Sequence, residues 1–84
     1  MRVRVSSPQE TIFCGEAEAV SLRTTGGDVR ILKRHAPYLA EIGAGALEVH
    51  RNGELMLSGK TSGGIVYNHE NEISVLLFEP CSIG

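Results

Sequence analysis

No stretch of this chain carries apolar residues at helical spacing for three full turns. The best helical candidate, Tyr38 to Ile42, is closed off by Gly43 and Gly45 before it reaches a length that is stable in water. Elsewhere, short alternating runs of apolar and polar residues are separated by turn residues, and ten glycines are scattered along the chain. This pattern is typical of short strands joined by tight turns. The sequence therefore predicts an all-β fold.

Alternation also predicts which side chains face the core. In the segment 2–6, Val3 and Val5 alternate with arginines, so the two valines should point inward. The segment 16–22 changes phase, because Ala17 and Ala19 occupy one face while the apolar residues that follow occupy the other. A one-residue slip reverses the faces of a strand, so we expect a β-bulge near Ala19.

The Asn52-Gly53 pair predicts a hairpin between residues 47–50 and 54–57. A two-residue loop would pair Arg51 with Glu54 and divide the apolar side chains between core and solvent. A three-residue loop over 51–53 would pair His50 with Glu54. It would also place four apolar residues on one face: Leu47, Val49, Leu55 and Leu57. We therefore expect the longer loop, with Gly53 in a left-handed conformation.

The last two strands are expected at residues 64–67 and 73–78, joined by the polar run 68–71. The total is nine or ten short strands in 84 residues, which constitute one domain spanning residues 1–84. That number of strands predicts a small sandwich or flattened barrel of two roughly five-stranded antiparallel sheets.

Composition excludes several classes of protein. The formal net charge of −2 argues against a dedicated nucleic-acid-binding protein, which needs a basic excess. The longest apolar run, Val75 to Phe78, is far shorter than the roughly 20 residues that span a bilayer, so direct membrane insertion is not expected. Cys14 and Cys81 are far apart and match no metal-binding or disulfide-rich pattern, so both are expected to be free thiols.

The residues that could carry chemistry form no recognisable site. The three histidines lie 15 and 19 residues apart, without metal-ligand spacing, and neither glycine pair is followed by a phosphate-binding helix. We therefore expect no catalytic residue, metal or cofactor. The local basic excess of Arg30, Lys33 and Arg34 remains, next to the segment 35–38. It is either a solvated face or an interaction edge.

The order of the motifs resembles the N-terminal β-sandwich of the epsilon subunit of F-type ATP synthases, which is called delta in mitochondria. The resemblance runs from Val3 to Leu77. It rests on six segments: Val5-Ser6-Ser7-Pro8, Phe13-Cys14-Gly15-Glu16-Ala17, Gly27-Asp28-Val29-Arg30-Ile31-Leu32, His35-Ala36-Pro37-Tyr38-Leu39, Ser62-Gly63-Gly64-Ile65-Val66 and Asn71-Glu72-Ile73-Ser74-Val75-Leu76. The family usually has Pro-Gly where this chain has Lys33-Arg34, which changes the charge of an edge used for contact.

The resemblance implies a non-catalytic subunit of the rotor, or central stalk, that binds the gamma subunit and the loops of the c-ring. It would couple proton transport to ATP synthesis. By analogy with the family, the turn 26–28 faces the c-ring, with Asp28 opposite a basic ring loop. The segment 35–39 faces gamma, with Tyr38 and Leu39 as apolar anchors. With Arg30 of the basic edge, the candidate partner-binding residues are Gly26, Gly27, Asp28, Arg30, His35, Ala36, Pro37, Tyr38 and Leu39.

Most members of the family continue into a C-terminal helical hairpin that inhibits ATP hydrolysis, whereas this sequence ends at Gly84. If the protein lacks that hairpin, we expect neither ATP binding nor inhibition of hydrolysis by this chain alone. The resemblance implies a peripheral location on the cytoplasmic face of the bacterial inner membrane, or on the equivalent organellar membrane. The alternative is a stand-alone β-sandwich that binds a peptide or a small ligand through the basic edge.

Overall fold

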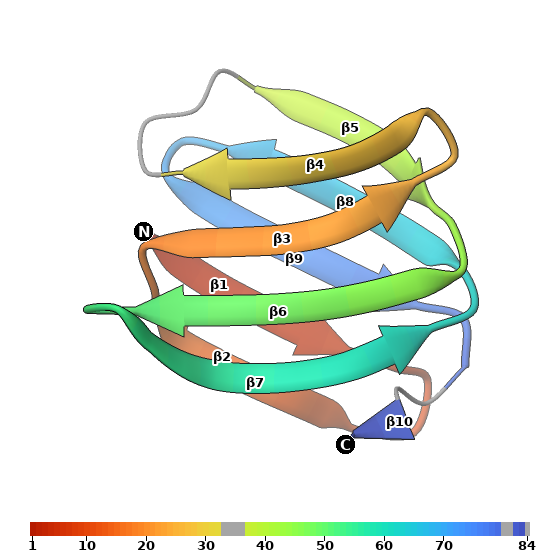
Figure 1. Cartoon of the computed structure of the whole chain (residues 1–84), viewed down its shortest axis with the longest axis horizontal. Coiled ribbons are helices and arrows are strands. Elements are labelled where there is room, and N and C mark those ends of the chain that lie inside the picture. The colour runs from red at the N-terminus through yellow and green to blue at the C-terminus, as the bar shows by residue number, and fades with distance from the viewer. Residues whose placement is uncertain (33–36, 80–81, 84) are drawn as a thin grey trace.

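The computed structural model describes residues 1–32, 37–79 and 82–83, and the described residues are organised as strands and turns (Figure 1). The strands are β1 (Arg2–Ser6), β2 (Thr11–Glu16), β3 (Ala19–Thr24), β4 (Gly27–Leu32), β5 (Tyr38–Ile42), β6 (Gly45–Arg51), β7 (Glu54–Thr61), β8 (Gly64–His69), β9 (Glu72–Leu77) and β10 (Ser82–Ile83). The ten strands confirm the all-β prediction.

The strands form two layers that pack face to face. One layer has the order β10-β7-β6-β3-β4 and the other has the order β5-β8-β9-β1-β2. In Figure 1 the first layer lies toward the viewer and the second lies behind it. The layers are joined where Thr24 of β3 pairs with Ile42 of β5, so the hydrogen-bonded sheet wraps around most of the core. The expected small sandwich of two five-stranded layers is confirmed.

One strand pair departs from the expected antiparallel arrangement. β1 lies between β2, its antiparallel neighbour, and β9, to which it runs parallel with Val3 opposite Ile73. Parallel neighbours need a long crossover connection. Here nearly the whole domain separates β1 from β9, and residues between them supply the opposite layer.

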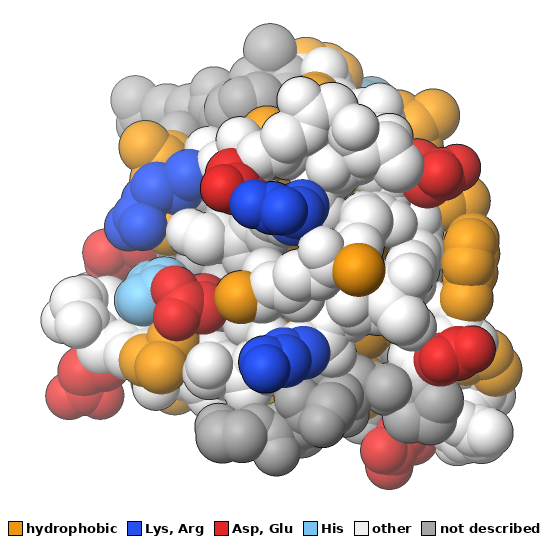
Figure 2. All heavy atoms as spheres, turned by 45° about the vertical axis from the view of Figure 1, so that its right-hand side comes forward, with side chains coloured by type: hydrophobic (Ala, Val, Ile, Leu, Met, Phe, Trp, Pro, Cys, Tyr) orange, Lys and Arg blue, Asp and Glu red, His pale blue; other side chains and the backbone are white. Residues whose placement is uncertain are grey.

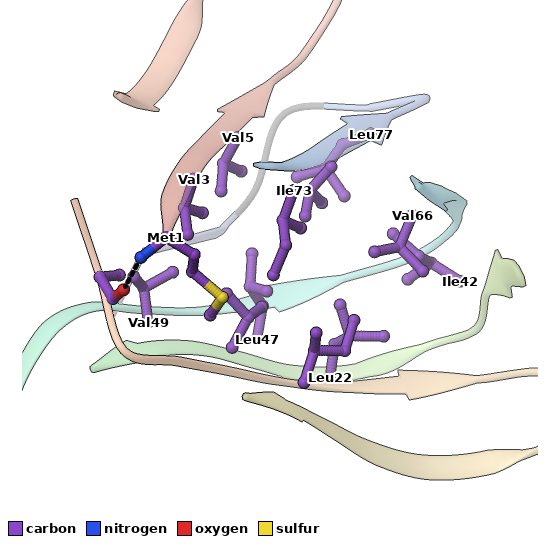
Figure 3. Close-up of a cluster of buried hydrophobic side chains, with 14 residues drawn as sticks. Met1, Val3, Val5, Leu22, Ile42, Leu47, Val49, Val66, Ile73 and Leu77 are labelled. Carbon is purple, nitrogen blue, oxygen red and sulfur yellow. Dashed lines mark hydrogen bonds between the residues drawn. The ribbon is translucent and has the colours of Figure 1, made fainter. Parts of the chain in front are cut away.

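The core fills the space between the two layers. Val3 and Val5 are fully buried, as the alternation in β1 predicts, and they lie opposite Leu47 and Val49 of the other layer (Figure 3). The cluster consists of Met1, Val3, Val5, Ala17, Val20, Leu22, Ile31, Ile42, Leu47, Val49, Val66, Ile73, Val75 and Leu77. Aliphatic side chains of this size interdigitate closely, and their burial is the main favourable contribution to folding.

The expected bulge near Ala19 is wrong. β2 ends at Glu16, the chain crosses to the other layer through Ala17 and Glu18, and β3 begins at Ala19. β3 then keeps an unbroken register with β4 and with β6. The amide nitrogen of Ala17 donates a hydrogen bond to the Met1 carbonyl oxygen at 2.9 Å. The change of phase in the sequence therefore marks a passage between layers, not a bulge inside one strand.

The expected three-residue hairpin loop is also wrong. Arg51 pairs with Glu54, and the two-residue loop places Asn52 at φ 53° and Gly53 at φ 77°. Both left-handed residues fit a type I′ turn, whose twist matches that of the flanking strands. A register shift between Val49 and His50 then restores the apolar phase.

This shift decides which apolar residues of the hairpin share a face. Val49 lies opposite Leu57, which packs against the core, whereas Leu55 lies opposite His50 and is half exposed. The expectation that Leu55 faces the core with Leu47, Val49 and Leu57 is therefore wrong for Leu55. A bulge reconciles a short turn with a continuous core, a combination that the alternation of apolar and polar residues does not by itself predict.

Candidate partner-binding surfaces

The turn between β3 and β4 is held by a side chain. The Thr24 hydroxyl oxygen accepts a hydrogen bond from the Gly26 amide nitrogen at 3.1 Å and donates one to the Gly27 carbonyl oxygen at 2.9 Å. Gly27 has a φ of 125°, a conformation that residues with a Cβ rarely adopt. The turn therefore has a defined shape, which fixes the position of Asp28 directly after it.

Asp28 forms an ion pair with Arg23 of the adjacent strand. Arg23 Nε lies 2.9 Å from Asp28 Oδ1, and Nη2 lies 3.4 Å from Oδ2. The hydrogen bond and the charge of Arg23 lower the pKa of the Asp28 carboxyl, and those of Asp28 raise the pKa of Arg23. Both side chains are exposed. Asp28 is thus presented on the surface, with a cation already beside it.

Arg30 lies on the same outer face as Asp28, two residues further along β4. Its Nη1 donates a hydrogen bond to the Ser21 hydroxyl oxygen at 3.4 Å. Figure 2 shows basic and acidic side chains interspersed across the layer that contains β4, β3 and β6. This face of the sandwich is therefore polar and carries charges of both signs.

The other candidate segment is only partly described. His35 and Ala36 lie outside the described residues, as do Lys33 and Arg34 of the basic edge. Pro37 is exposed. Tyr38 and Leu39 point to opposite faces of β5: Tyr38 is half buried against the core, whereas the Leu39 side chain is 68% exposed.

Leu39 belongs to an apolar face that was not predicted from the sequence. In the register of the layer, Leu39 of β5 lies opposite Tyr67 of β8, and Ile65 of β8 lies opposite Leu76 of β9. All four are exposed, by 68%, 45%, 38% and 50% respectively. We call this set (Leu39, Ile65, Tyr67 and Leu76) the apolar face. The sequence does indicate this face, because residues 64–67 and 75–78 are apolar at both odd and even positions, so both sides of these strands carry apolar side chains.

The two groups of candidate residues lie on opposite sides of the molecule. Asp28 and Arg30 are on the outer surface of the layer that contains β4, whereas Leu39 is on the outer surface of the layer that contains β5. The structure therefore does not bring them into one site. It provides a polar face and an apolar face with the core between them.

The described residues include few other groups that could react or bind a ligand. Within them, no group of three or more His, Cys, Asp or Glu side chains could hold a metal ion. No helix that is long and apolar enough to cross a membrane occurs in residues 1–32, 37–79 or 82–83. Cys14 is a free, exposed thiol, while Cys81 lies outside the described part of the chain.

This architecture and these motifs match a known family. The family model described as ATP synthase, Delta/Epsilon chain, beta-sandwich domain covers residues 1–79. The chain belongs to this family.

Curated relatives carry the name ATP synthase epsilon chain. The protein of Ruminococcus albus is 32% identical over 75 residues, which are 89% of this chain and 56% of the relative. The protein of Leptospira interrogans is 36% identical, over 90% of this chain and 59% of the relative. This chain therefore spans little more than half the length of these relatives. A relative from Frankia casuarinae is 30% identical and is covered over 89% of its own length.

Solved structures confirm the fold. A chain in the central stalk and c-ring structure of the Tetrahymena thermophila mitochondrial ATP synthase matches with a TM-score of 0.80 at 15% identity. The match covers 93% of this chain and 63% of that one. A chain in the OSCP/F1/c-ring structure of the Euglena gracilis mitochondrial ATP synthase matches with a TM-score of 0.82 at 24% identity, over 92% and 49% of the two chains.

Proposed function

We propose that this chain is a non-catalytic subunit of the central stalk of an F-type ATP synthase. It binds the gamma subunit and the loops of the c-ring, and so couples proton transport to ATP synthesis. The observation that carries the proposal is the family match over residues 1–79, which includes both layers of the sandwich. The subunit would be peripheral to the membrane, on the cytoplasmic face in a bacterium, and would reach the membrane through the ring.

The apolar face is the proposed surface for gamma. Leu39 is the exposed member of the candidate segment 35–39, and Ile65, Tyr67 and Leu76 extend its apolar surface over two more strands. Contiguous apolar surface of this kind is typical of protein interfaces, and buried aromatic and aliphatic side chains are their usual anchors. Tyr38 would support this surface from beneath, because it packs against the core.

Residues 26–28, at the end of the turn and the start of β4, form the proposed surface for the c-ring together with Arg30. Asp28 offers a carboxylate to a basic ring loop, and the Thr24 hydrogen bonds hold the turn that carries it. A cation on the ring would share Asp28 with Arg23. Because the proposed gamma and ring surfaces lie on opposite layers, both partners can be bound at once through one sandwich.

Co-purification with the gamma subunit from the same genome, followed by sizing, tests the proposal. We expect a stable one-to-one complex. Leu76→Ser should weaken it, because an exposed leucine that becomes buried in an interface contributes about 2 kcal/mol, or roughly thirtyfold in Kd. Leu55→Ser is the matched control, since Leu55 is also 50% exposed but lies on β7 in the other layer.

Two results would contradict the proposal. If folded wild-type chain and assembly-competent gamma do not associate, the rotor function is wrong for this chain. If gamma binds but Leu55→Ser weakens the complex as much as Leu76→Ser does, the apolar face is not the gamma surface.

A further inference from the structure

A shallow groove crosses the outer surface of β4, β3 and β6. Its volume is about 530 Å³, and the side chains that line it include Ser21, Arg23, Asp28, Arg30, Ala46 and Glu48. The floor is low because the residues in the middle are small. Gly45 also lets the Arg23 stem lie across β6, since a Cβ there would come within 2.9 Å of Arg23 Cβ. The groove is therefore built by a serine, a glycine and an alanine between charged walls.

Arg30 and Glu48 form the two walls and do not neutralise each other. Both pair with Ser21, from opposite sides of β3, so two strand spacings, or about 10 Å, separate their Cα atoms. Among the residues that the structure describes, no carboxylate lies within 4.0 Å of the Arg30 guanidinium. Its hydrogen bond within this set goes to the neutral Ser21 hydroxyl.

The other charged side chains of the groove have polar partners. Asp28 is paired with Arg23 at 2.9 Å, and Glu48 Oε1 lies 3.4 Å from His50 Nε2. Arg30 is thus the charged group of the groove that remains open to an anion. The Ser21 hydroxyl accepts the Arg30 hydrogen bond, which leaves its own hydrogen available for a second oxygen of the same ligand.

We propose that this groove binds an acidic side chain of a c-ring loop, with the carboxylate on Arg30 and the Ser21 hydroxyl. The inference rests on the proposed function, because the groove begins at Asp28, next to the turn proposed to face the ring. The ring loop accordingly contains an aspartate or a glutamate. Arginine suits this contact, since its planar guanidinium can bind a carboxylate through two hydrogen bonds.

The affinity of the chain for the c-ring from the same genome, in detergent, tests the inference. Arg30→Gln should raise Kd about tenfold, the loss typical of one charge-assisted contact at a partly hydrated interface. Arg4→Gln is the matched control: Arg4 is an exposed arginine in the middle of β1, on the outer surface of the opposite layer. Arg30→Gln should also make the affinity less sensitive to salt.

A charge reversal separates a direct contact from a loss of local structure. Arg30→Glu should abolish ring binding, and a lysine in place of the acidic residue of the ring loop should restore it. Unchanged ring affinity in Arg30→Gln, or a ring whose exposed loops contain no Asp or Glu, would overturn the inference and leave the rotor function intact. If the wild-type chain binds neither gamma nor the ring, both the groove inference and the proposed rotor function are wrong.

A free anion is the competing ligand for the same chemistry. Inorganic phosphate titrated into the ¹⁵N-labelled chain should leave the amides of residues 21 and 30 unshifted at millimolar concentration. Saturable phosphate binding that Arg30→Gln removes, together with an unaltered ring affinity in that variant, would assign the groove to a small anion instead.

Discussion

Gly64→Ala would place a methyl group inside the backbone of the neighbouring strand. A Cβ at position 64 would collide with the Leu76 carbonyl oxygen and lie 3.0 Å from the Leu77 Cα, whereas ordinary contacts of this kind begin at 3.4 Å. Gly64 is buried and pairs with Leu77, so both obstructing atoms belong to the β9 backbone and no flexible side chain can yield. Overpacking of a dense core lowers the free energy of unfolding by about 1–3 kcal/mol. Because backbone must move here, we expect a loss of about 3 kcal/mol, at the upper end of that range.

Thermal and urea unfolding of purified variants measure this loss. For a domain of this size, about 3 kcal/mol corresponds to a fall in Tm of roughly 12–24 °C. Gly15→Ala is the control, because Gly15 also lies inside a strand but its added Cβ would meet only the Phe13 ring, at 3.8 Å. It should be neutral or stabilising by up to about 1 kcal/mol. Equal stability of the two variants would refute the steric argument.

Two further substitutions test the turn that carries Asp28. Thr24→Val keeps the shape of the side chain but removes both hydrogen bonds of the turn, so urea unfolding should show a loss of about 1–2 kcal/mol; Thr25→Val, at an exposed position, should show almost none. Asp28→Asn tests the ion pair. Because the folded-state pKa of Asp28 is lowered, its contribution to stability is present above the unfolded-state pKa and is lost as the pH falls through the folded-state value. The stability difference between wild type and Asp28→Asn should therefore shrink in acid, and a difference that stays constant to the lowest measurable pH would contradict this assignment.

Local patterns predicted the strands well, because alternation reports burial directly. Val3 and Val5 face the core as expected, and β1 to β9 follow the apolar runs, whereas the short strand β10 after residue 78 was not expected. The errors arose where the phase of a pattern changed. At Ala17 the change marks a crossing between layers, and after His50 it is absorbed by a register shift. Phase alone does not distinguish a crossing, a bulge and a longer loop, since each offsets the alternation by one residue.

The candidate site was predictable in part. Leu39 is exposed and a turn precedes Asp28, but this turn comprises residues 25–26, because Gly27 and Asp28 already begin β4. The expectation that Tyr38 and Leu39 are both surface anchors left out the pleat of β5, which directs successive side chains to opposite faces. The apolar face combines residues of three strands that are distant in sequence. Within the described part of the chain, Arg30 lacks a neighbouring carboxylate for a similar reason: the pairing of the strands places Glu48 on the far side of Ser21. Such properties come from tertiary structure, which one sequence does not display.

The parallel pair of β1 and β9 has a consequence for folding kinetics. Residue 3 cannot pair with residue 73 until almost the entire domain has been synthesised, so β1 lacks this neighbour while the intervening strands form. Contacts between residues so far apart in sequence carry a large loop-closure entropy and slow the search for the native state. On the ribosome, the domain should therefore close in one late step, after β9 has left the exit tunnel. Until then, the exposed edge of β1 is where chaperones or misassembly would compete with native pairing.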